Sequence, residues 1–227
     1  MPRRYLPFVL LCVVGCRAPL SLEKRPARTE LREALTDLES ARGGDLRSPD
    51  TSAENLEAAI LQRIDRLAFE NPDHPPTLVA KAALAYESRD FITAQKHLDQ
   101  ALRADPTSVP ATLLRVRIAA EQGNLPFARR KLDEQLALHP DHAGLHQARA
   151  GILYLTEDYE EAMEELDLAE RLGATEVWRL NYHRGLIAEA TEETELALEH
   201  YQRCLEENPD FEPALRRERW LNGRDIR

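Results

Sequence analysis

Small and large apolar residues recur along the chain at a constant distance. An alanine is followed four positions later by a large apolar side chain, and this pair returns at one fixed interval, with a last step that is one position longer. The pairs are Ala94 and Leu98, Ala128 and Leu132, Ala162 and Leu166, and Ala197 and Tyr201. Residues four apart share one face of an α-helix, so each pair predicts a helix packed against a neighbour. No alternating strand-like run occurs, and we predict an all-α fold built from repeated units.

Four full units follow one another, at residues 75–108, 109–142, 143–177 and 178–211. Three of them close with a proline, at Pro106, Pro140 and Pro209, which stops the second helix before the next unit begins. The third has Ala174 instead, beside a one-residue slip in the repeat at residues 173–175. We expect the path of the array to change there.

These units resemble the tetratricopeptide repeat, a helix-turn-helix unit of about 34 residues. In that family, small residues at the eighth and twentieth positions let the two helices cross closely, and a large apolar residue at the twenty-fourth fills the space between units. The eighth positions here hold Ala82, Val116, Ala150 and Gly185, and the fifteenth, glycine in the family, holds Arg89, Gly123, Glu157 and Glu192. The resemblance covers about two thirds of the chain and implies a right-handed solenoid of antiparallel helix pairs.

Both ends of the array depart from the pattern. Residues 29–74 predict a degenerate first helix pair, with leucines and isoleucines at helical spacing in 29–41 and 55–69 and a polar loop at 42–52. Residues 212–227 predict a capping helix and tail, with Trp220 or Leu215 against the core and arginines outward. Cys204 holds a small-residue core position, which predicts a buried, inert thiol.

The N-terminus has the pattern of an export signal. Two arginines precede a short apolar run at residues 6–14, which is far below the roughly 20 residues needed to span a bilayer. The sequence Val13-Val14-Gly15-Cys16 then resembles the lipobox of bacterial lipoproteins. That resemblance implies a signal peptide at residues 1–15, lipid chains on Cys16, and a tether at 16–28. A plain secretory signal or a buried helix is the alternative. Arg17, where an aspartate marks inner-membrane retention in enteric bacteria, favours the outer membrane.

Charge and motifs exclude several classes of protein. The net charge of −10 argues against a nucleic-acid binder, which needs a clustered basic face. No phosphate loop, nucleophile elbow or paired-cysteine motif occurs, so we expect no enzyme and no cofactor. His139, His142 and His146 straddle a proline turn, and we expect no metal there. The acidic run at 157–170 predicts a solvated outer face.

The first helices of such a solenoid supply its inner face, and we expect a groove there for a peptide or helix of another protein. Tyrosine and arginine, which favour binding hot spots, are well represented at these positions. The predicted groove residues are Val79, Tyr86, Leu113, Arg117, Gln147, Tyr154, Arg179, Tyr182 and Glu189. The alternative for any single tyrosine is that it packs against the next unit. The Lys/Asn/Arg cluster with which chaperone-binding relatives hold a terminal carboxylate is absent.

The sequence thus predicts a lipid-anchored, non-catalytic scaffold on the periplasmic face of the outer membrane. It would bind another envelope protein and is similar in build to the pilotins of type IV pilus biogenesis and related secretion factors. Two alternatives stay open. One is a structural lipoprotein that self-associates by exchanging residues 29–69 between subunits, and the other is an adaptor that regulates a cell-wall enzyme.

Overall fold

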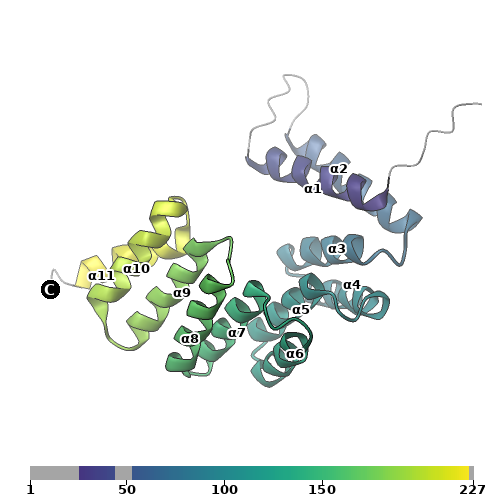
Figure 1. Cartoon of the computed structure of the whole chain (residues 1–227). Coiled ribbons are helices and arrows are strands. Elements are labelled where there is room, and N and C mark those ends of the chain that lie inside the picture. The colour runs from purple at the N-terminus through teal and green to yellow at the C-terminus, as the bar shows by residue number, and fades with distance from the viewer. Residues whose placement is uncertain (1–25, 44–52, 225–227) are drawn as a thin grey trace, which may run out of the picture.

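A computed structural model of the chain describes residues 26–43 and 53–224 (Figure 1). These residues form 11 α-helices and no strand, which confirms the predicted all-α fold. The helices are α1 (Ala27–Gly43), α2 (Ala53–Glu70), α3 (Pro75–Glu87), α4 (Phe91–Ala104), α5 (Val109–Glu121), α6 (Leu125–Leu138), α7 (Ala143–Leu155), α8 (Tyr159–Arg171), α9 (Val177–Ala190), α10 (Thr194–Glu207) and α11 (Glu212–Arg224).

The helices form consecutive pairs that stack into a curved solenoid (Figure 1). Each first helix packs against the second helix of its own unit and also against the first helices of neighbouring units, along the series α1, α3, α5, α7 and α9. In the described part of the chain the second helices make no comparable contacts with one another. We call the side on which the first helices meet the inner face.

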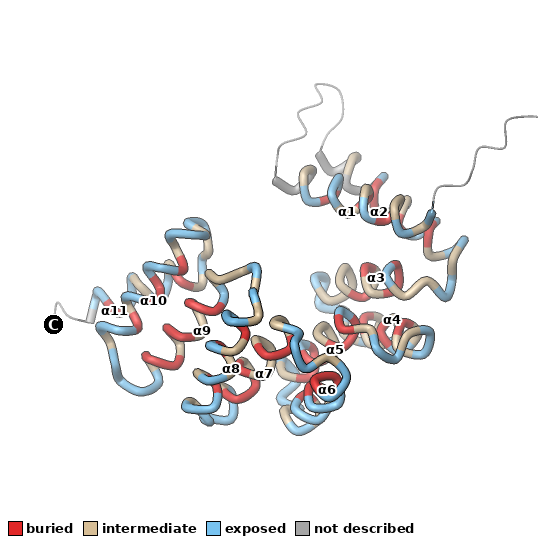
Figure 2. The backbone as a smooth tube through the Cα atoms, in the orientation of Figure 1, coloured by how far each residue is buried: buried red, intermediate tan, exposed pale blue. Residues whose placement is uncertain are grey.

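The core consists of the repeated residues that the sequence singled out. Ala94, Ala128, Ala162 and Ala197 are fully buried, and so are the large residues four positions later, Leu98, Leu132, Leu166 and Tyr201. Figure 2 shows that buried positions lie along the sides of helices that face one another. Burying one such large side chain contributes roughly 1.5–3 kcal/mol. The buried residues form apolar clusters, each of which joins one helix pair to the helix that follows it.

The turn inside each unit has a left-handed residue. Gly123 has φ 75°, and Arg89, Glu157 and Glu192 at the equivalent positions have φ 61°, 66° and 65°. The backbone conformation of the family is therefore kept where its glycine is missing, at a cost of roughly 1–2 kcal/mol per non-glycine residue. Asp90 and Asn124 then begin the following helices, because their side chains accept hydrogen bonds from the backbone N–H of Thr93 and Phe127.

The one-residue slip has a local cause at the end of α8. Gly173 is left-handed, with φ 81°, and the N–H of Ala174 donates to the carbonyl of Ala169. This is the glycine-ended Schellman arrangement, and it replaces the proline that ends the other second helices. Helix α8 therefore ends one residue earlier than α4 and α6 do, and α9, with 14 residues, is one residue longer than α7, with 13.

Ion pairs join successive units at the same place in each repeat. A cation at the seventh position of a unit meets an aspartate on the preceding second helix. The pairs are Lys81 with Asp65 at 3.0 Å, Arg115 with Asp99, Arg149 with Asp133 at 3.9 Å, and Arg184 with Asp167 at 2.7 Å. The aspartates recur at one constant interval, a periodicity that the apolar pattern does not reveal. We call this series the aspartate ladder.

The first helix pair is joined by charges as well as by its apolar core. Arg63 of α2 lies 3.6 Å from Glu30, 3.1 Å from Glu33 and 3.3 Å from Asp37, all on α1. Helix α1 begins at Ala27, so the last two residues of the predicted tether are helical. The predicted signal peptide (1–15), Cys16 and most of the 42–52 loop lie outside the described residues. None of the described helices combines the length and apolar character that crossing a membrane would require.

Helix α11 covers the last unit, but with other residues than expected. Ala214 is fully buried and Leu221 is 1% exposed, whereas Trp220 is 47% exposed and Leu215 is half-buried. Trp220 or Leu215 was expected against the core, and the buried residues of α11 are Ala214 and Leu221 instead. Ala214 and Leu221 lie one repeat length after the buried Leu180 and Ile187, so α11 repeats the register of a first helix.

Candidate protein-binding face

The nine predicted groove residues lie on the first helices of the four full units. Val79 and Tyr86 lie on α3, Leu113 and Arg117 on α5, Gln147 and Tyr154 on α7, and Arg179, Tyr182 and Glu189 on α9. Arg117 and Arg179 are exposed, and the other seven are half-buried. A surface with mixed exposure of aromatic, aliphatic and basic groups can bind both apolar and charged side chains.

The N-terminal half of this face is organised around Tyr86. Its hydroxyl donates to Glu121, and the guanidinium of Arg117 lies 5.0 Å above its ring. Arg89 also lies 3.5 Å from Glu121, so one carboxylate joins the first and second units. Burial, and next the hydrogen bond to Glu121, raise the pKa of Tyr86. Glu121, which the sequence did not single out, fixes the tyrosine and also lies 4.0 Å from Arg117, whose side chain is 65% exposed.

Glu189 has a structural role at the C-terminal end of the face. It accepts a hydrogen bond of 2.8 Å from the buried hydroxyl of Tyr201 and pairs with Arg217 of α11 at 2.7 Å. Burial and this hydrogen bond raise the pKa of Tyr201. Since its side chain is only 15% exposed, Glu189 serves mainly to connect α9, α10 and α11.

Tyr182 is one of the tyrosines that pack within the protein. Its ring lies 5.0 Å from that of Phe211, edge to face, and 5.9 Å from that of Tyr201. Trp178 contacts Phe211 as well, at 4.8 Å. Tyr154 makes a looser contact with Tyr159, at 6.1 Å. Replacing Tyr182 would therefore disturb the fourth unit as well as the face.

Of the three histidines near the third unit, His146 has a packing role. His146 is buried, with Nδ1 2.6 Å from Glu165 and Nε2 2.7 Å from the carbonyl of Pro140. It connects the two helices of its unit with the turn before them. Within residues 26–43 and 53–224, no group of three or more potential ligands could hold a metal ion.

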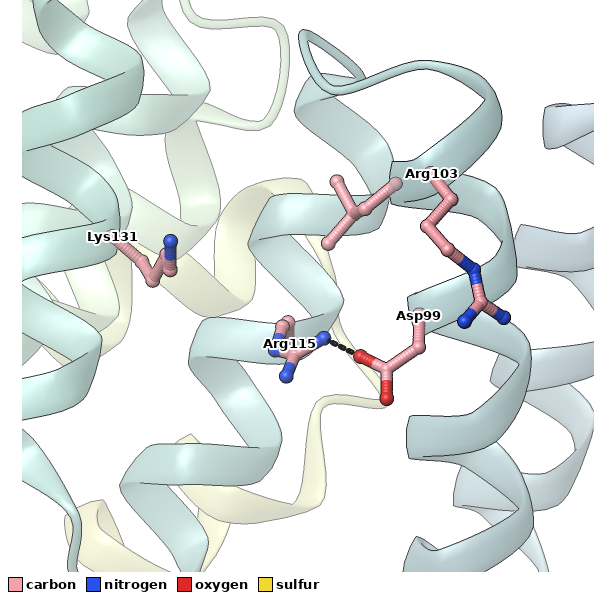
Figure 3. Close-up of a pocket in the computed structure, with 5 residues that line it drawn as sticks. Asp99, Arg103, Arg115 and Lys131 are labelled. Carbon is pink, nitrogen blue, oxygen red and sulfur yellow. Dashed lines mark hydrogen bonds and ion pairs between the residues drawn. The ribbon is translucent and has the colours of Figure 1, made fainter.

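A pocket of about 350 Å³ lies elsewhere, between α4, α5 and α6 (Figure 3). It is lined by Asp99, Leu102, Arg103, Arg115 and Lys131 and contains one ion pair of the aspartate ladder. Arg115 and Lys131 also lie 5.5 Å and 6.0 Å from the ring centre of Phe127. None of the nine predicted groove residues lines this pocket, so it is separate from the inner face.

Two family models described as tetratricopeptide repeat match the chain, one at residues 79–134 and 113–177 and the other at 179–211. Together these matches cover more than half of the sequence, in the register that the helix pairs define. The chain belongs to the tetratricopeptide repeat family. Proteins built from this repeat are typically non-catalytic and bind other proteins, often in the concave groove.

Solved structures of the family share the fold. A tetratricopeptide repeat protein from Parabacteroides merdae has a TM-score of 0.64 at 20% identity, over 86% of this chain and 78% of that one. A thermophilic protein of the family from Thermus thermophilus gives 0.68 at 18% identity, over 86% and 98%. Cut9 in the Cut9–Hcn1 hetero-tetramer gives 0.67 at 12%, over 88% and 41%. No functionally curated protein matches the sequence.

Proposed function

We propose that this protein is a lipid-anchored scaffold whose inner face holds a segment of another protein. It would act at the periplasmic face of the outer membrane, where it assembles or stabilises an envelope complex such as a pilus or secretion machine. The observation that carries the binding role is the arrangement of the first helices, which place Tyr86, Arg117, Gln147 and Tyr154 along one continuous side.

The solvent exposure of the inner face supports this role. Arg117 lies over Tyr86 and still exposes 65% of its side chain, so it can bind a carboxylate or carbonyl of a partner. Leu113 and Gln147 are half-buried on neighbouring helices and offer an apolar and a polar contact. Association with other proteins is also seen in a structural neighbour, because Cut9 was solved in a hetero-tetramer with Hcn1.

The anchor is supported by the N-terminal sequence. Two arginines, a short apolar run and Val13-Val14-Gly15-Cys16 have the order of a lipoprotein signal. Several acyl chains on Cys16 would bind the membrane firmly, since each buried CH₂ contributes on the order of 0.8 kcal/mol. The tether would then place the solenoid away from the lipid surface.

Metabolic labelling with a palmitate analogue tests the anchor. The protein should be labelled and should fractionate with membranes, and Cys16→Ser should abolish both. Equal labelling of the Cys16→Ser variant would exclude lipidation at this residue.

A site-specific photocrosslinker tests the binding role. Placed at Gln147 or Arg117, it should join the protein to a discrete partner in cells, and Arg117→Glu should remove the product obtained from Gln147. Arg171, exposed on the second helix α8, is the matched control position. A crosslinking pattern that is the same from Arg171 as from Gln147 would contradict binding on the inner face.

A further inference from the structure

Helix α11 keeps the register of a first helix, because Ala214 and Leu221 are buried as Leu180 and Ile187 are. In that register Arg216 and Trp220 follow Tyr182 and Leu186 by one repeat length. They therefore occupy the positions that face inward on each preceding first helix.

Both residues are accessible at these positions. Trp220 is 47% exposed, and the side chain of Arg216 is 71% exposed. The positions of α11 that would face a second helix of the same unit are polar instead, since Arg219 and Asn222 are exposed there. The helix thus ends the core with a polar side. Its register places Trp220 at the position equivalent to Leu186 of the preceding first helix.

The charges around Trp220 are opposite in sign to the rest of the chain. Helix α11 contains four arginines and two glutamates, whereas the chain as a whole has a net charge of −10. Arg216 lies 3.8 Å from Glu212, a pair between exposed side chains that contributes little and can exchange for a better acceptor. Arg217 is 44% exposed beyond its contact with Glu189.

We propose that the binding face extends onto α11 and selects a partner segment in which acidic residues flank an aromatic or aliphatic side chain. The apolar side chain packs against Trp220, and its acidic neighbours pair with Arg216 and Arg217. This inference rests on the proposed function and adds the chemistry of the partner. Trp220 supplies contact area, and the arginines discriminate against basic segments.

A random peptide library displayed on phage tests the proposal with the purified full chain as bait. Selected peptides should be enriched in aspartate or glutamate next to an aromatic or aliphatic residue. In fluorescence anisotropy, Trp220→Ala and Arg216→Glu should each weaken their binding by at least about tenfold. Ile92→Ala, which removes an 84% exposed apolar side chain on the second helix α4, should leave binding unchanged.

The outcomes separate this inference from the proposed function. The selected peptides could lose affinity when Arg117 or Gln147 is replaced, yet bind the Trp220→Ala and Arg216→Glu variants as tightly as the original chain. That result would overturn the inference alone. A library that gives no peptide dependent on any inner-face residue would overturn both. Arg216→Glu does not alter the buried Ala214 and Leu221, so its circular dichroism spectrum should match that of the original chain. That measurement separates a loss of binding from a loss of fold.

Discussion

Gly185 of α9 and Tyr201 of α10 lie so close that no side chain fits between them. A Cβ atom on Gly185 would lie 2.5 Å from Cε1 and 2.7 Å from Cδ1 of the tyrosine. The ring has no room to retreat, because it is fully buried and its hydroxyl donates to Glu189. This contact sets how closely the two helices of the fourth unit cross.

Gly185→Ala should therefore destabilise the protein, by roughly 1–3 kcal/mol for an overpacked core. Gly151, one turn from the end of α7, is the control, since a Cβ there meets nothing within 4 Å. Gly151→Ala should stabilise the helix by roughly 0.5–1 kcal/mol. Urea unfolding followed by circular dichroism measures both. If the two variants unfold at the same urea concentration, the close contact between Gly185 and Tyr201 does not affect the stability of the fold.

Cys204 should be unreactive in the folded protein. The thiol is fully buried, and burial raises its pKa to about 11, so very little thiolate exists near neutral pH. In a chain with Cys12→Ser and Cys16→Ser, iodoacetamide should alkylate Cys204 roughly a hundredfold more slowly under native conditions than in guanidinium chloride. Rapid alkylation under native conditions would show that the fourth unit opens readily.

The periodic part of this fold could be predicted from the sequence because it is fixed by nearest neighbours. Ala94 and Leu98 have equivalents in the other full units because every unit packs against the next in the same way. These residues are buried in the structure, as expected. The aspartate ladder also carried a signal in its constant spacing, but surface charges are too common for such spacing to stand out without coordinates.

The ends of the array could not be predicted in the same way. Trp220 or Leu215 was expected against the core, yet the residues of α11 that are buried are Ala214 and Leu221. The contact of Tyr182 with Phe211 involves a residue in the turn before α11, outside the repeated positions. Only the folded arrangement brings these rings together. The sequence therefore could not show which tyrosines pack within the protein and which remain accessible on the inner face.

The stability of the protein should fall as the pH drops below about 6.5, in part because of His183. Burial, and next the charge of Arg179, lower the pKa of this histidine to about 4, and its Nδ1 lacks a hydrogen-bond partner among the described residues. The unfolded chain, in which histidine titrates near 6.5, then binds more protons than the folded one. Between the two pKa values each pH unit removes up to about 1.4 kcal/mol, and above about pH 6.5 the effect is absent.

His183→Leu should flatten this dependence between about pH 5 and pH 7, and leucine fits the position because Leu114 is its equivalent in the second unit. Urea midpoints measured across this range provide the test. A slope unchanged by His183→Leu would assign the acid sensitivity to other groups.

Arg184 should control how firmly the fourth unit is coupled to the third. Its side chain is only 10% exposed and reaches from α9 to Asp167 at 2.7 Å and Glu170 at 2.6 Å, both on α8. This is the junction after the one-residue slip, and Arg184 makes two short contacts there. Both acids are about half exposed and can be solvated when the arginine is lost, so Arg184→Met should cost only about 1–2 kcal/mol.

The loss should be local, because a solenoid is stabilised by contacts between nearest neighbours. Amide hydrogen exchange in Arg184→Met should accelerate in α9, α10 and α11 while α3 to α6 keep their protection. Arg203→Met is the matched control, since that arginine is 54% exposed and pairs with Glu199 within α10. Uniform loss of protection from α3 to α11 would mean that the array unfolds as one cooperative body. A local loss would instead identify the junction held by Arg184 as the place where the C-terminal part of the solenoid separates first.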